Sequence, residues 1–228
     1  MSIWTRLAVA LAAIGDSIGA FLQQAASSRA TPPEKSIAFT IGMIALSAKM
    51  AKADGIVSQV EILAFKQVFQ IADDDLPSVA RVFNLAKQDV AGFESYARQI
   101  ARLFQGGTAI LEDVLDGLFH IAKADDALHP AELDFLAQVA SIFGFTDSDF
   151  RRIRARHVSV AGDPYAILDV DPGAASETIR RRYLDLVREY HPDRHIAAGV
   201  PEEMIEIATQ RLQTVNAAYD QIMKERAL

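Results

Sequence analysis

The chain has 228 residues, half of them hydrophobic, with a formal net charge of −7 and a pI near 5.2. This length allows one or two domains with substantial cores, and the composition is typical of a globular protein. The acidic balance argues against nucleic acid as a partner, and the absence of cysteine excludes disulfide scaffolds and cysteine-based zinc sites.

The first thirty residues are predicted to contain an amphipathic helix. Apolar residues between positions 3 and 24 share one helical face: Ile3, Leu7, Leu11, Ile14, Ile18 and Phe21. Arg6 and Asp16 interrupt the apolar run, which makes the segment a poor transmembrane span. We expect the helix to pack on the following domain or to self-associate. Contact with a membrane surface and a secretory signal peptide are the alternatives.

Residues 31–157 are predicted to form successive amphipathic helices. Thr31-Pro32-Pro33-Glu34 has the capping-box pattern that opens a helix, Gly106-Gly107 interrupts the run, and Thr146 caps the last helix. No stretch shows convincing two-residue alternation, the pattern of a half-buried strand. The predicted fold class is therefore all-α.

This helical region contains an internal repeat. Residues 51–65 match residues 122–136, and Asp54 and Asp125 stand 71 residues apart. Each copy ends one helix with Ala-Lys-Ala-Asp, turns, and starts a second helix with a glutamate in its first turn. The duplicated pattern resembles the TerB-like, or tellurite-resistance type, all-α domain over roughly residues 35–157.

Four repeated acids are candidate ligands for a divalent cation: Asp54, Glu61, Asp125 and Glu132. They could converge if the two copies pack as a pseudo-symmetric pair, because hard cations need several oxygen ligands together. Helix capping is the preferred interpretation, since acids at a helix N-terminus are stabilised without an ion. The basic cluster Arg151–Arg156 is likewise expected to be a solvated helix face, with contact to an acidic partner as the alternative.

The C-terminal part carries the clearest functional pattern. A short helix is predicted to begin at Pro164, and a third helix at Pro201. Between them, apolar residues from Ile179 to Tyr190 recur at helical spacing opposite an arginine-rich face. Proline ends that helix, so His191-Pro192-Asp193 is predicted to form an exposed turn that Asp193 can brace.

The order of these elements, together with the His-Pro-Asp tripeptide, resembles the J domain of DnaJ-type co-chaperones over roughly residues 163–224. The segment after the tripeptide is similar to the DjlA-type branch, in which a TerB-like domain precedes the J domain. The resemblance implies that the tripeptide and the exposed helix face dock on a DnaK-type chaperone and stimulate its ATP hydrolysis. It implies His191, Pro192 and Asp193 as the stimulating turn. Arg180 and Arg181 are the implied docking residues, and we add Arg188 from the exposed face.

The arginine-rich helix departs from the usual J-domain pattern. Leu184 and Asp185 stand where a basic pair is common, and Glu189 stands where a lysine is usual. Arg182 and Arg188 add charge elsewhere, so the helix remains basic while its docking charge is redistributed. Such changes affect on-rate and specificity, and therefore the affinity for the partner more than the activity.

We therefore expect an amphipathic N-terminal helix at 1–30, a TerB-like helical domain at 31–157, a linker at 158–162 and a three-helix J domain at 163–228. No catalytic motif is found, so the expected function is a non-enzymatic, cytoplasmic co-chaperone without a cofactor. A peripheral position on the inner face of the membrane is the alternative location. The alternative function is a metal-responsive stress protein acting through the repeated acids. The client protein is not predicted.

Overall fold

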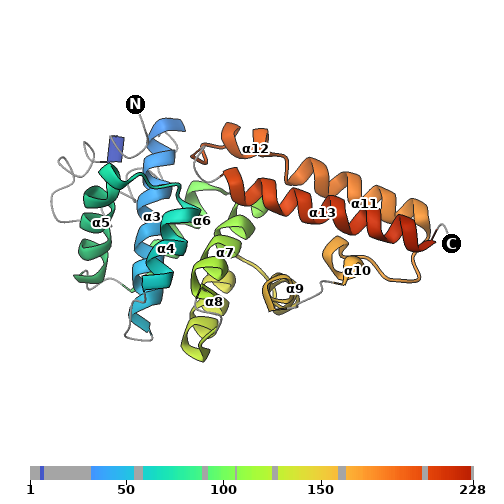
Figure 1. Cartoon of the computed structure of the whole chain (residues 1–228), viewed down its shortest axis with the longest axis horizontal. Helices are drawn as coiled ribbons and strands as arrows, with labels where there is room; N and C mark the ends of the chain where they lie inside the picture. The colour runs from blue at the N-terminus through green and yellow to red at the C-terminus, as the bar shows by residue number, and fades with distance from the viewer. Residues whose placement is uncertain are drawn as a thin grey trace.

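The computed structural model describes residues 6–7, 32–53, 59–88, 92–105, 107–124, 128–158, 163–201 and 205–226 (Figure 1). Within these ranges the regular structure is helical and contains no strand, so the all-α prediction is confirmed. The predicted N-terminal helix lies outside the described residues except for Arg6 and Leu7, and Leu7 is buried in the main core. No helix in the described ranges is long and apolar enough to cross a membrane.

In the TerB-like part, helices begin at Pro32, directly after Gly107 and directly after Thr146, where the sequence predicted helix boundaries. The described helices of this part are α3 (Pro32–Ala53), α4 (Gln59–Val68), the 3-10 helix η1 (Asp73–Asp75), α5 (Leu76–Gln88), α6 (Phe93–Leu103), α7 (Thr108–Ala122), α8 (Pro130–Ile142) and α9 (Asp147–Val158). At the start of α9, the backbone N–H of Asp149 donates to Thr146 Oγ1 at 3.2 Å, and that of Thr146 donates to Asp149 Oδ2 at 3.0 Å. This reciprocal cap satisfies donors that lack partners within the helix.

The internal repeat is visible in how the helices pack. The first copy contributes α3 and α4, and the second contributes α7 and α8. The second helix of each copy contacts the first helix of the other, because α4 packs on α7 and α8 packs on α3. The long α3 and α7 also contact each other and run through the middle of this part (Figure 1). Residues 109–119 of α7 are all buried, which is typical of a helix enclosed on every side.

The C-terminal part consists of α10 (Pro164–Leu168), α11 (Ser176–Glu189), α12 (Pro192–Ala197) and α13 (Ile205–Arg226). The helices α11 and α13 lie antiparallel and side by side (Figure 1), and the rings of Tyr183 and Tyr219 stack between them at 4.1 Å. At the far end, Arg226 donates to the carbonyl oxygens of Pro172 and Ala174, each at 2.7 Å. These contacts fix the start of α11 against the end of α13.

The two parts share apolar packing. Val200, which follows α12, belongs to the core of the TerB-like part, and Ile207 of α13 packs against that core. In the other direction, Ala109 of α7 belongs to the core of the C-terminal part. A Cβ on Gly117 would lie only 3.0 Å from Ile207 Cδ1, so this glycine lets α13 approach α7 closely. The position of the C-terminal part therefore depends on α7.

A pair of leucine substitutions tests this core. Leu118 is fully buried in α7, whereas the side chain of Leu63 on α4 is exposed. We expect Leu118→Ala to lower the free energy of unfolding by about 2–5 kcal/mol, because it removes buried methyl groups and leaves a cavity. We expect the control, Leu63→Ala, to change it by no more than ~0.5 kcal/mol. Urea unfolding followed by circular dichroism measures both, and equal losses would contradict the assignment of the core.

Candidate functional site

The His-Pro-Asp tripeptide is exposed at the junction of α11 and α12. The His191 side chain is 50% exposed and that of Asp193 is 84% exposed. The tripeptide is not a free turn, as the sequence suggested, but the start of α12, with Pro192 at the first helical position. His191 also takes the bracing role predicted for Asp193, because its Nδ1 accepts a hydrogen bond from the backbone N–H of Asp193 at 3.2 Å.

The neighbouring face of α11 is basic and accessible. Arg180 and Arg181 are both exposed. Arg188 is also exposed, but its Nη1 lies 3.5 Å from Asp185 Oδ1, so part of its charge is matched on the same helix. Arg182 is half-buried. Its Nη2 lies 3.1 Å from Oδ2 of Asp169, a residue in the turn after α10. The residues with the least compensated charge are therefore Arg180 and Arg181.

Behind the tripeptide, two buried side chains face the TerB-like part. Tyr190 precedes the tripeptide, and its hydroxyl donates to Glu112 Oε2 of α7 at 3.4 Å. His195 lies in α12 and is 2% exposed. Its Nδ1 donates to the backbone oxygen of His191 at 3.2 Å, and its Nε2 faces Asp113 Oδ2 at 2.5 Å. Both flanks of the tripeptide are thus in contact with acids of α7.

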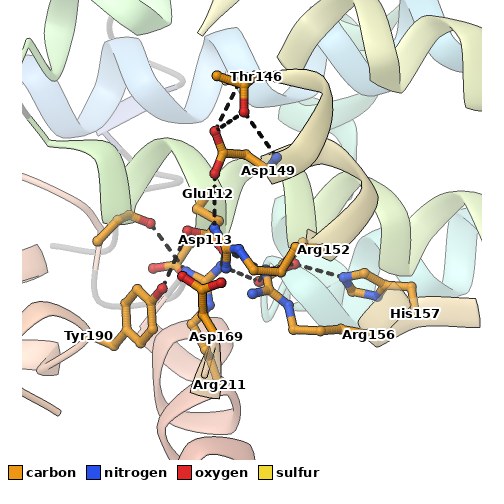
Figure 2. Close-up of polar contacts among 12 residues, drawn as sticks. Glu112, Asp113, Thr146, Asp149, Arg152, Arg156, His157, Asp169, Tyr190 and Arg211 are labelled. Atoms are coloured by element: carbon orange, nitrogen blue, oxygen red, sulfur yellow. Dashed lines mark hydrogen bonds and ion pairs between the residues drawn. The ribbon is translucent and has the colours of Figure 1, made fainter. Parts of the chain in front are cut away.

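Arg211 of α13 is the centre of this buried polar cluster (Figure 2). Its side chain is 4% exposed, and its Nη2 lies 3.0 Å from Glu112 Oε1 and 2.8 Å from Asp116 Oδ2. Its Nη1 pairs with Asp113. The guanidinium also lies 4.3 Å from the centre of the Tyr190 ring. One side chain therefore connects α13, the flank of the tripeptide and all three acids of α7.

Helix α9 contributes the remaining cations of the cluster. Arg152 Nη1 lies 3.0 Å from Glu112 Oε1, and Arg156 Nη2 lies 2.7 Å from the same oxygen. Arg156 and His157 also contact Asp116, at 3.1 and 2.7 Å. The prediction that Arg151–Arg156 forms a solvated face is therefore wrong for Arg152 and Arg156. Their acidic partners, Glu112 and Asp116, lie within the same chain, on α7.

The charges of the cluster shift the pKa values of its members. Burial alone would raise the pKa of Asp116, but Arg211 and Arg156 outweigh that effect and hold it far below its usual range. The pKa of Glu112 is lowered against the same burial penalty, by Arg211, Arg156 and Arg152. Burial, followed by the Glu112 charge, raises the pKa of Tyr190 to about 12. Glu112 and Asp116 are therefore ionised at neutral pH, and the Tyr190 hydroxyl keeps its proton.

Of the four predicted metal ligands, the structure describes the side chain of Glu132 alone. Asp54 and Asp125 lie outside the described residues, and Glu61 lies in α4 without a described side chain. Glu132 is 1% exposed and accepts a hydrogen bond from the backbone N–H of His129 at 3.0 Å, as a capping acid does. Within the described ranges, no group of three or more histidines and acids is arranged to hold a metal ion.

Sequence reasoning missed Glu112, Asp113, Asp116 and Arg211. The sequence nevertheless contained a signal for the three acids, because they interrupt a predominantly apolar helix at positions 112, 113 and 116. A helix that is apolar on every side is expected to be buried, and buried acids require partners. The sequence alone does not identify those partners, because Arg211 stands 95 residues beyond Asp116.

Comparison with known proteins agrees with this two-part architecture. The family of tellurite resistance protein TerB matches residues 40–155, and the DnaJ domain matches residues 163–227. The chain is 27% identical to "Co-chaperone protein DjlA" of Photobacterium profundum, over 88% of this chain and 82% of the relative. It is 28% identical to the protein of that name from Coxiella burnetii, over 91% of this chain and 85% of the relative. No solved structure matches the chain significantly.

The chain belongs to the TerB family, with a DnaJ domain after its TerB domain. The same comparisons confirm the DjlA-type resemblance inferred from the sequence, because the relatives named DjlA match most of the chain.

The buried acids predict a pH-dependent stability. Because the pKa of Glu112 is lowered from 4.5 in the folded chain, its contribution is fully present above pH 4.5 and is lost as the pH falls below it. We expect Glu112→Gln to lower the free energy of unfolding at pH 7 by about 1–3 kcal/mol, because it removes a buried charge that Arg152, Arg156 and Arg211 share. The difference from the unchanged chain should shrink toward pH 3.

Urea unfolding at pH 7, 5, 4 and 3 measures this effect. The matched control is Glu225→Gln, at an exposed position of α13, which should follow the unchanged chain at every pH. A Glu112→Gln chain that loses stability with acid as steeply as the unchanged chain would contradict the assignment.

Proposed function

We propose that this chain is a co-chaperone that recruits a DnaK-type chaperone through its J domain and stimulates the chaperone's ATP hydrolysis. The observation that carries the proposal is the exposed His191–Asp193 tripeptide beside the exposed Arg180 and Arg181. The DnaJ match and the printed names of the relatives support a DnaK-type partner. The chain would then be an activator of another protein's ATPase and not itself an enzyme.

The geometry supports a role for each group. The guanidinium groups of α11 would attract an acidic surface of the chaperone and accelerate association. Because His191 Nδ1 accepts a hydrogen bond within the chain, its Nε2 is the ring nitrogen available to donate to the partner. Asp193 would offer a carboxylate beside it, and Pro192 fixes the backbone between the two.

The TerB-like domain would target the J domain to a client protein, a membrane surface or a regulator in the cytoplasm. Membrane-surface contact or self-association through residues 3–24 belongs to the same proposal. We do not propose the metal-responsive alternative, because capping accounts for Glu132, and the described ranges hold no group of three or more histidines and acids arranged for a metal ion.

Replacement of His191 tests the stimulating role. We expect His191→Gln to abolish stimulation of single-turnover ATP hydrolysis by the DnaK-type chaperone of the same organism. The chain should remain folded, because the side chain is half-exposed and outside both cores. The matched control is His120→Gln, at an exposed position of α7, which should stimulate normally. Equal stimulation by the unchanged and His191→Gln chains would refute the proposal.

Replacement of the two exposed arginines tests docking separately. Each exposed charge pair contributes about 0.2–1 kcal/mol, so we expect the double variant Arg180→Ala, Arg181→Ala to raise the half-saturating concentration about 2- to 30-fold. The stimulated rate at saturation should stay the same, and added salt should reduce the difference. Arg98→Ala, Arg102→Ala, at exposed positions of α6, is the control. A lowered maximum rate with unchanged half-saturation would contradict a docking role.

A further inference from the structure

The helix that begins with His-Pro-Asp cannot hold its own position. The helix α12 has six residues, and helices this short are not stable in isolation. The side chains of His191 and Asp193 are exposed, so packing of these side chains does not hold the tripeptide in place. Its position relative to α11 therefore depends on the contacts that α12 and its flanks make with the rest of the chain.

Within the J domain, α12 packs on α13, and Arg194 Nη1 donates to the backbone oxygen of Arg188 at 3.3 Å. The TerB-like domain adds contacts at both ends of α12. On the α7 side, His195 Nε2 faces Asp113, and the same imidazole donates through Nδ1 to the backbone oxygen of His191. A single ring thus joins an acid of the TerB-like domain to the backbone of the tripeptide. After α12, the hydroxyl of Ser36 on α3 donates to the backbone oxygen of Gly199 at 2.6 Å.

Arg211 fixes the residue just before the tripeptide. Its guanidinium pairs with Glu112, Asp113 and Asp116, and it lies over the ring of Tyr190. Tyr190 in turn donates to Glu112. Three acids and three arginines are removed from water in this cluster, an arrangement that costs desolvation energy and rarely adds stability over an apolar contact. Such groups can instead specify one relative orientation of the elements that they join.

We infer that the TerB-like domain holds the His-Pro-Asp tripeptide in its stimulating position, with Asp113, acting through His195, as a positioning residue for the co-chaperone activity. This inference rests on the proposed function and deepens it. The TerB-like domain is then a structural part of the activating surface as well as a targeting domain. Asp113 touches no partner in this mechanism, because it acts through the imidazole of His195.

The test uses the full chain and separates docking from stimulation. We expect Asp113→Asn to lower the maximum stimulated rate of single-turnover ATP hydrolysis by about tenfold or more, because a misplaced group loses catalytic effect steeply. The half-saturating concentration should remain the same, since Arg180 and Arg181 are untouched. In parallel, hydrogen exchange of the α12 amides should become faster, whereas exchange of the α11 amides should not change. Asp134→Asn, at an exposed position of α8, is the matched control for both readouts.

A second variant covers the case in which Asp113→Asn fails to fold. Ser36→Ala removes only the hydrogen bond to Gly199 and should shift both readouts in the same direction by a smaller amount. If the unchanged chain stimulates and a folded Asp113→Asn chain reaches the same maximum rate, the positioning inference is wrong and the proposed function stands. The same applies if Asp113→Asn does not fold and Ser36→Ala reaches the normal maximum. If the unchanged chain itself gives no stimulation, the proposed function fails, and the inference fails with it.

Discussion

The relation between the two domains depends on one buried guanidinium. Arg211 comes from the J domain, yet its charge is matched by Glu112, Asp113 and Asp116 of the TerB-like domain. Burial alone would lower the pKa of Arg211, but these acids outweigh it and raise that pKa above its usual range. If the J domain moved away, Glu112 and Asp116 would still have Arg152 and Arg156 of α9. Asp113 and Arg211 would lose the ion pairs that they form across the interface. The docked arrangement is therefore the one in which every charge of the cluster is paired.

This pairing determines which surfaces of the J domain face the TerB-like domain and which remain exposed. The exposed arginines and the tripeptide lie on α11 and at the start of α12, whereas contact with the TerB-like domain is made by α13 and by the buried flanks of the tripeptide. The surface proposed to meet the chaperone and the surface that meets the TerB-like domain are thus separate. They are nevertheless mechanically connected, because Tyr190 and His195 lie within four residues of His191.

The internal repeat explains why α7 is the helix against which the J domain packs. In the packing of the two copies, α4 covers α7 and α8 covers α3, which places α7 inside the TerB-like core. Helix α7 also contacts α9 and α13. Helix α9 contributes Arg152 and Arg156 to the cluster, and α13 contributes Arg211. Ala109 and Gly117 are small, so α13 approaches closely enough for Arg211 to reach all three acids. The duplicated domain thus provides a rigid helix on which a second domain can be oriented.

The sequence by itself determined the all-α class, the repeat, the Thr146 cap of α9 and the start of α10 at Pro164. Capping residues, prolines and helical periodicity act over only a few residues. It also predicted the exposure of the tripeptide and of Arg181 and Arg188. It did not determine that Arg152 and Arg156 pair with acids of α7, that His191 caps α12, or that Arg211 pairs with the same acids. Those features depend on which helices meet, and the cluster joins residues as far apart in the sequence as Glu112 and Arg211. Only the tertiary structure decides such pairings, because the sequence shows each charge without the partner that neutralises it.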